Sequence, residues 1–114
     1  MKTIFHNPRC SKSREGLNFL KESGEKFEIK EYLKEPLSEG ELKELLEKLN
    51  MSPIELIRTN EKIWQEEYKN KDLDDAELIR VMLKHPQLIQ RPIVADKDNA
   101  VIARPASRIK NLPD

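Results

Sequence analysis

The sequence predicts an α/β fold in which a mixed sheet is assembled from two halves of the chain. A short apolar strand, a helix and a second strand follow one another in the first third, an order typical of a βαβ unit with parallel strands. The middle of the chain shows only helical patterns. Two β-branched runs then flank a turn and precede a closing helix, which predicts a ββα unit.

Length and charge limit the possible functions. The 114 residues predict one domain, residues 1–114, with a helical insert over about 38–85. Lys and Arg number 21, as do Asp and Glu, so the basic excess of a nucleic-acid-binding protein is absent. No run of apolar residues has the length of a membrane span, and no signal-peptide pattern follows Met1. We therefore expect a soluble, cytoplasmic protein that contacts neither nucleic acid directly nor membranes.

The first half of the sheet is predicted from alternation and from a helix stop. Residues 2–5 form the first strand, and residues 11–23 form a helix that ends before Gly24. Residues 26–33 alternate between apolar and charged side chains, which predicts the second strand. The residues expected on one side of that strand are Phe27, Ile29, Glu31 and Leu33.

The helical insert is predicted from three capping boxes, in which Ser or Asp is followed three residues later by Glu. These pairs are Ser38 with Glu41, Ser52 with Glu55, and Asp74 with Glu77. Pro53 suits the first position of the second helix, and Pro86 lies beyond the end of the third. Residues 59–72 are polar and predict a loop with a helical turn.

The C-terminal third predicts a hairpin and a closing helix. Residues 92–95 and 100–103 flank the turn 96–99, and residues 105–112 form the helix. The complete order is thioredoxin-like, with the connection between its halves expanded into helices. In that order the Arg91-Pro92 bond begins a strand at the usual place of a cis peptide that faces a nucleophile.

Cys10 is the one cysteine, so the chain forms no internal disulfide and no Cys-rich zinc site. It lies between a strand and a helix, where the first helical N–H groups lack intrahelical partners and favour an anion. The thiolate is the nucleophilic form of a cysteine. The alternative is a small buried apolar side chain without chemistry. Because the neighbours are Arg, Ser and Lys, we favour a reactive thiol.

A reactive thiol here needs more than the helix terminus. Lowering a cysteine pKa by about two units takes ~2.7 kcal/mol, and a partly buried helix end supplies up to ~2 kcal/mol. The groups that could contribute the rest are Arg9, Lys12, Arg14 and His6. His6 lies close enough to modulate the ionisation of Cys10, and equally it could be a turn histidine bonded to backbone.

Three arginines lie at predicted element ends: Arg58, Arg91 and Arg104. Each one alone could be a solvated surface charge. Arginine is nevertheless the side chain best suited to planar, bidentate recognition of oxyanions. Together with a thiol at a helix N-terminus they predict an oxyanion site.

These motifs, taken together, resemble the glutaredoxin-coupled arsenate reductase (ArsC) family, which is thioredoxin-like. The matching segments are residues 6–10, Ser13-Arg14, residues 91–94 and Arg104-Pro105, and the likeness covers nearly the whole chain. Ser11-Lys12 departs from the Gly-Thr of the family. By position, the resemblance implies that Cys10 is the nucleophile, that His6 tunes it, and that Arg58, Arg91 and Arg104 bind the oxyanion. Ser13, Arg14 and Pro92 would support the site.

The resemblance also implies a chemistry. Cys10 would attack arsenate, and because the chain has no second cysteine an external thiol must resolve the adduct. Glutathione is then the co-substrate and a glutaredoxin the partner, in arsenic detoxification. We expect no metal and no bound cofactor.

Two other functions remain open at this point. Spx-type transcription factors, which bind RNA polymerase, are similar in fold and in the cysteine segment. They commonly carry a Cys-x-x-Cys pair, whereas this chain has Ser13 at the second position. The other alternative is a general glutathione-dependent thiol-disulfide oxidoreductase.

Overall fold

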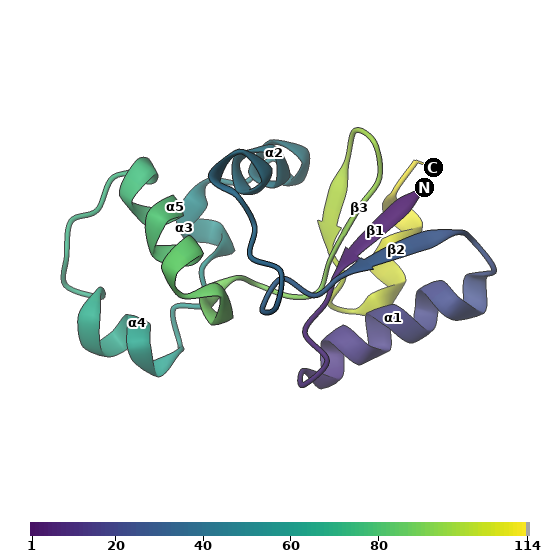
Figure 1. Cartoon of the computed structure of the whole chain (residues 1–114), viewed down its shortest axis with the longest axis horizontal. Coiled ribbons are helices and arrows are strands. Elements are labelled where there is room, and N and C mark those ends of the chain that lie inside the picture. The colour runs from purple at the N-terminus through teal and green to yellow at the C-terminus, as the bar shows by residue number, and fades with distance from the viewer. Residues whose placement is uncertain (114) are drawn as a thin grey trace. The chain divides into compact units, whose positions relative to one another are not determined.

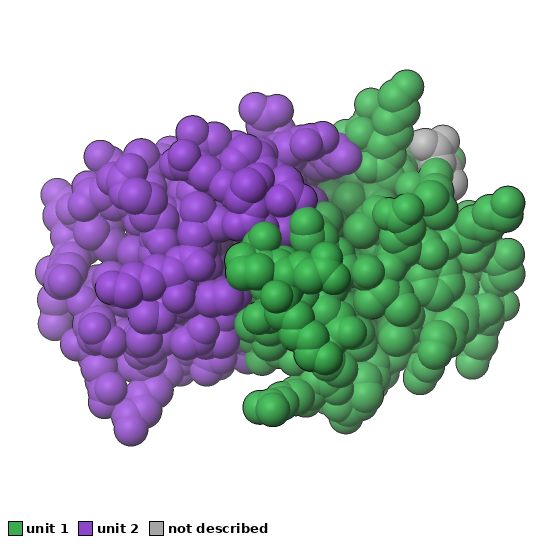
Figure 2. Space-filling model, viewed as in Figure 1, with its two compact units in different colours: residues 1–36, 91–114 green, residues 37–90 purple. Residues whose placement is uncertain are grey.

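The computed structural model describes residues 1–113; Asp114, the last residue of the predicted domain, lies outside the described residues. The chain divides into two compact units (Figures 1 and 2). The sheet unit comprises residues 1–36 and the residues from 91 onward, and the helical unit comprises residues 37–90. The insert predicted from the sequence spans about 38–85, within this helical unit. That the whole chain acts as a single domain stays a prediction.

The sheet unit contains four strands in the order β2-β1-β3-β4. They are β1 (Lys2–Phe5), β2 (Phe27–Lys30), β3 (Ile93–Ala95) and β4 (Ala100–Ile102). β1 pairs parallel with β2 and antiparallel with β3, and β3 pairs antiparallel with β4. The predicted βαβ unit, the hairpin and the mixed sheet are confirmed.

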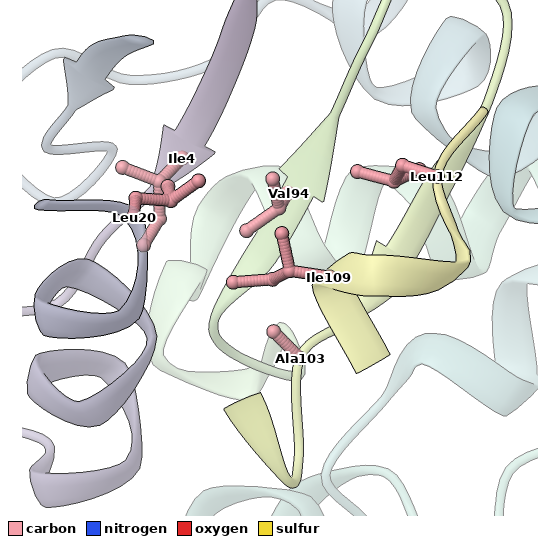
Figure 3. Packing of buried hydrophobic residues seen from close by; sticks show 6 residues of the cluster. All are labelled: Ile4, Leu20, Val94, Ala103, Ile109 and Leu112. Atoms are coloured by element: carbon pink, nitrogen blue, oxygen red, sulfur yellow. The ribbon is translucent and has the colours of Figure 1, made fainter. Parts of the chain in front are cut away.

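One face of this sheet is covered by α1 (Ser11–Ser23) and by the 3₁₀ helix η2 (Ala106–Asn111). Ile4 of β1 lies opposite Val94 of β3, so both side chains point to this face. Figure 3 shows the cluster that they form with side chains of the two helices. Its buried members are Ile4, Leu20, Val94, Ala103, Ile109 and Leu112.

Two glycines shape α1. Gly24 ends the helix in the left-handed conformation, with φ of 75°, and its N–H donates to the carbonyl of Lys21. At Gly16 a Cβ atom would lie 2.9 Å from Cγ of Pro92. The missing side chain therefore lets the middle of α1 approach the start of β3.

The second strand is shorter than predicted. β2 ends at Lys30 instead of Leu33, because the carbonyl of Glu31 accepts hydrogen bonds from the N–H groups of Lys34 and Glu35 in a turn. Ile29 is 48% exposed and Leu33 is 41% exposed, whereas Tyr32 is buried. The alternating pattern thus identified the strand and the face toward the core, on which Phe27 packs against the cluster, but Ile29 remains partly exposed because β2 is an edge strand.

The helical unit contains α2 (Glu39–Leu49), α3 (Pro53–Leu56), α4 (Lys62–Glu67), α5 (Asp75–Lys84) and the 3₁₀ helix η1 (Pro86–Leu88). All three predicted capping boxes are present, at the N-termini of α2, α3 and α5. They place each helix start at the predicted residue or next to it.

Within residues 59–72, where the sequence predicts a loop with a helical turn, the structure has α4, and its Trp64 is buried. Two contacts connect other segments of the helical unit. Ile57 and Ile89 form an isolated antiparallel bridge beside α3. The Tyr68 hydroxyl is hydrogen-bonded with Nε2 of His85 at 3.0 Å. Within residues 1–113, no helix combines the length and apolar character needed to cross a membrane.

Candidate active site

The loop between β1 and α1 is held in a turn by Asn7. Its side-chain oxygen accepts a hydrogen bond from the N–H of Arg9, and its carbonyl accepts one from the N–H of Cys10, each at 3.0 Å. Asparagine is a residue type that favours turns, and Asn7 has that role here. The turn places Cys10 in extended conformation immediately before the first residue of α1.

The buried hydroxyl of Ser13 joins this loop to the helix. Ser13 Oγ accepts a hydrogen bond from the N–H of Asn7 at 2.9 Å and is hydrogen-bonded with Nδ1 of His6 at 2.6 Å. All three residues are buried. The start of the loop that carries Cys10 is therefore attached to the first turn of α1 by two hydrogen bonds, one from His6 and one from Asn7.

His6 is held as a neutral imidazole. Its burial lowers its pKa below the ordinary value, and the charges of Arg14 and Lys21 act in the same direction. Glu31 and the contact with Ser13 oppose this shift without cancelling it. Near pH 7, His6 is consequently able to accept or pass on a proton through its ring nitrogens.

Cys10 is partly exposed and more acidic than an ordinary cysteine. Burial raises the pKa of its thiol, but the backbone N–H groups of Ser13 and Lys12 and the guanidinium of Arg91 outweigh that effect. The net pKa is lowered. The helix N-terminus thus stabilises the thiolate as the sequence predicts, and the helper charge comes from Arg91, at the far end of the chain.

Arg91 and Arg104 flank the β3–β4 hairpin at one end. The N–H of Ala103 donates to the carbonyl of Pro92 at 2.9 Å, and Nη1 of Arg104 lies 3.4 Å from the carbonyl oxygen of Arg91. The Arg91-Pro92 bond is cis, as predicted, and so is the Arg104-Pro105 bond. The sheet unit therefore brings Cys10, Arg91 and Arg104 to the same region.

The other candidate residues lie in different surroundings. Arg58 belongs to the helical unit, where its N–H donates to the carbonyl of Leu88 at 2.7 Å and its Nε lies 3.6 Å from Oε1 of Glu61. Arg14 donates from Nη1 to the carbonyl of Pro8 at 2.9 Å, so it braces the loop from its exposed side. Pro92 is buried against Gly16.

Sequence reasoning gave Asn7 and Ser13 smaller roles than the structure does. The residue type of Asn7 suggests a turn and no more, yet its N–H also donates a hydrogen bond to Ser13 Oγ. Ser13 occupies the third position of α1, the position whose N–H ordinarily faces the residue that caps a helix. The spacing of Ser13, three residues after Cys10, was the signal that could have identified the role of Ser13. Among residues 1–113, no group of three or more His, Cys, Asp or Glu side chains is arranged to hold a metal ion.

Comparison with known proteins agrees with this geometry. Residues 5–112 match the sequence model of the ArsC family. Arsenate reductase of Neisseria meningitidis is 38% identical over 94% of this chain and 93% of its own length. An uncharacterized Escherichia coli protein, YfgD, is 43% identical over 96% of this chain and 93% of its own length. The solved structure of arsenate reductase from Vibrio cholerae superposes with a TM-score of 0.90 at 35% identity, covering 96% of this chain and 95% of that one.

Proposed function

The chain belongs to the ArsC family, and we propose that it is an arsenate reductase in which the sulfur of Cys10 attacks the arsenic atom. The observation that carries this proposal is the thiol of lowered pKa at the N-terminus of α1, with the guanidinium of Arg91 beside it. A thiolate next to a fixed cation is suited to attack on an oxyanion, because the cation offsets the repulsion between two anions.

Three arginines are proposed to hold the oxyanion. Arg91 and Arg104 come from the two ends of the hairpin, and Arg58 comes from the helical unit. Since a guanidinium is always charged and presents a planar fork, it can bind two oxygens of a tetrahedral anion at once. This assignment requires the sheet unit and the helical unit to act together as one domain.

The proposed reaction has two steps. The Cys10 thiolate forms a sulfur–arsenic bond, and one arsenate hydroxyl takes up a proton and leaves as water. A glutathione thiol then loses its proton and attacks the sulfur of Cys10, the sulfur–arsenic bond breaks with its electron pair going to arsenic(V), and arsenite leaves behind a disulfide between Cys10 and glutathione. Two thiols are oxidised to one disulfide for each arsenate reduced, and one water is released.

The external thiol follows from the cysteine count. With Cys10 as the one cysteine, the chain holds no partner for an internal disulfide. We propose glutathione as co-substrate and a glutaredoxin as the protein that regenerates Cys10. The cytoplasm is the compartment in which a glutathione pool keeps such thiols reduced. We assign His6 the task of tuning Cys10 from the buried side of the loop.

The test is arsenate reduction by the purified chain with glutathione and a glutaredoxin. Turnover should need both thiols and should disappear in Cys10→Ser, while Ser11→Ala, next to it on the exposed side of the helix, should keep most of the activity. Arsenate turnover by Cys10→Ser would overturn the assignment of the nucleophile. Turnover without any added thiol would overturn the proposed route of reduction.

The arginines are tested separately. We expect Arg58→Ala, Arg91→Ala and Arg104→Ala each to lower kcat/KM for arsenate by about 10- to 100-fold, the effect of losing ~1.5–3 kcal/mol of charged hydrogen bonding. Arg108→Ala, an exposed arginine of η2, is the matched control. If Arg58→Ala behaves like the control, Arg58 is no oxyanion ligand.

The same variants separate this function from its alternatives. A general thiol-disulfide oxidoreductase would reduce a mixed glutathione disulfide faster than arsenate, and Arg58→Ala and Arg104→Ala would retain that activity. A polymerase-binding regulator would co-purify with RNA polymerase and leave arsenate unreduced. Arsenate-selective turnover that falls in the arginine variants supports the reductase.

A further inference from the structure

The loop around Cys10 carries a local excess of positive charge. Residues 6–14 include three basic side chains and no Asp or Glu, whereas the whole chain balances 21 basic against 21 acidic residues. Two of the three, Arg9 and Lys12, lie on either side of Cys10 in the sequence, and both are exposed. The third, Arg14, is already bonded to a carbonyl of the loop. Arg9 and Lys12 are therefore the two cations that the loop presents to solvent.

A second substrate reaches Cys10 from this exposed side. The inner side of the loop is closed, because His6, Asn7 and Ser13 are buried and hydrogen-bonded with one another. In the proposed reaction the oxyanion lies at the guanidinium of Arg91. The sulfur of Cys10 is nevertheless partly exposed. A thiol that attacks this sulfur must therefore pass the two exposed cations.

The two cations differ in their surroundings. The N–H of Arg9 donates to Oδ1 of Asn7 at 3.0 Å, which fixes its backbone, and its guanidinium has no ion-pair partner within residues 1–113. Nζ of Lys12 lies 3.4 Å from Oε2 of Glu15, and these side chains are 49% and 55% exposed. Such a surface pair contributes little stability, so a ligand can compete for either member. The loop thus offers an unpaired guanidinium before the thiol and a cation beside an anion after it.

The charges of glutathione have the same arrangement. Its thiol lies in the middle of the tripeptide, its glycine ends in a carboxylate, and its γ-glutamyl residue carries a carboxylate and an ammonium side by side. We propose that Arg9 binds the glycine carboxylate, and that Lys12 and Glu15 bind the γ-glutamyl carboxylate and ammonium. A guanidinium fork suits the lone carboxylate, since it can donate to both oxygens. The choice of glutathione as the thiol rests on the proposed function.

The experiment measures formation of the disulfide between Cys10 and glutathione, without arsenate. The Cys10 thiolate attacks one sulfur of glutathione disulfide, a new sulfur–sulfur bond forms, and one glutathione thiolate leaves. The intact mass of the protein gives the rate, which is divided by the rate with uncharged hydroxyethyl disulfide. Both reactions use the same thiolate fraction, so the ratio does not depend on the pKa of Cys10.

Arg9→Ala should lower this ratio for glutathione disulfide by roughly two- to fivefold, the effect of losing an exposed ion pair. For the same disulfide with its glycine carboxylates esterified, Arg9→Ala should leave the ratio unchanged, because the group that Arg9 binds is no longer charged. Both variant and wild type should lose selectivity at high salt, which screens exposed charges.

Lys12→Ala should lower the ratio for glutathione disulfide and for its glycine ester by a similar factor. It should not change the ratio for the disulfide of Cys-Gly, which lacks the γ-glutamyl residue, and Glu15→Gln should show the same selectivity. Lys43→Ala is the matched control, since Nζ of Lys43 lies 4.0 Å from Oε1 of Glu39 in another exposed helical pair. It should leave every ratio unchanged.

Three results would overturn the proposal. Equal slowing of the free acid and the ester in Arg9→Ala would show general attraction of anions instead of contact with the glycine carboxylate. A Lys12→Ala variant that behaves like Lys43→Ala would exclude the γ-glutamyl contact, and a ratio that rises in Glu15→Gln would exclude the ammonium contact. Circular dichroism confirms the fold of each variant. Because the assay contains no arsenate, its outcome and that of the arsenate assay can differ, so a failure of either one is recognised separately.

Discussion

Ser13 Oγ lies 2.6 Å from Nδ1 of His6 and 2.9 Å from the N–H of Asn7. A single buried hydroxyl therefore ties the end of β1 to the first turn of α1. The nucleophile-bearing loop between them owes its shape to this contact and to the turn at Asn7.

Ser13→Ala removes both contacts and leaves a buried N–H and a buried imidazole nitrogen without their partner. We expect the free energy of unfolding to fall by about 1–3 kcal/mol, measured by urea denaturation. Ser11→Ala, two residues earlier and exposed, should change it by less than about 0.5 kcal/mol. Equal stability of the two variants would show that the hydroxyl contributes little.

Arg91→Ala should raise the pKa of Cys10, because the guanidinium stabilises the thiolate by charge and by hydrogen bonding. The rate of alkylation by iodoacetamide follows the thiolate fraction, so its midpoint should move to higher pH and the rate at pH 7 should fall several-fold. Arg91→Lys should give an intermediate profile, and Arg108→Ala should match the wild type. A midpoint unmoved in Arg91→Ala would remove Arg91 from the thiolate environment.

His6 makes stability depend on pH in a predictable direction. Its pKa in the folded chain is lowered, so below about pH 6.5 the unfolded chain binds more protons at this site than the folded one. The stabilisation is complete above that pH and is lost as the pH falls through the folded pKa. His6→Asn, which keeps a polar atom near the position of Nδ1, should lose less stability than the wild type between pH 7.5 and pH 5. Identical pH dependence would contradict this.

Gly16→Ala should destabilise the sheet unit. Its new Cβ would lie 2.9 Å from Cγ of Pro92, so α1 or β3 must shift, at an expected cost of about 1–3 kcal/mol. Gly40→Ala is the matched control, since its Cβ would meet nothing closer than 4.0 Å and alanine favours a helix. Thermal unfolding of both variants gives the comparison, and a Gly16→Ala melting temperature at or above that of Gly40→Ala would contradict the close packing.

The elements that local chemistry determines could be predicted from the sequence. Each capping box fixes a helix start through hydrogen bonds within four residues, and Gly24 ends α1 through its own backbone conformation. The order of strands and helices then gave the mixed sheet, and with it the position of Cys10 before α1.

Features that depend on distant contacts could not be predicted in this way. Alternation over residues 26–33 predicts a strand, but Ile29 is exposed because no further strand covers that edge. Sequence spacing likewise suggested Arg9 and Arg14 as helpers of Cys10, whereas Arg14 binds Pro8 and Arg91 supplies the charge beside the thiol. Arg91 was expected to face the nucleophile only from the thioredoxin-like order of elements and the resemblance to the ArsC family, because nothing near Cys10 in the sequence signals an arginine from the last quarter of the chain.

The antiparallel pairing of β1 with β3 has a consequence for synthesis of the chain on the ribosome. β1 emerges first, yet its antiparallel neighbour emerges only after the whole helical segment 37–90. Residues 37–90 are contiguous, so the contacts within this segment can form while translation continues. Contacts between segments that are distant in sequence, such as β1 and β3, form more slowly. The thiol of Cys10 gains its guanidinium neighbour only when Arg91 has left the exit tunnel, so a truncated nascent chain carries the cysteine without that contribution to its lowered pKa.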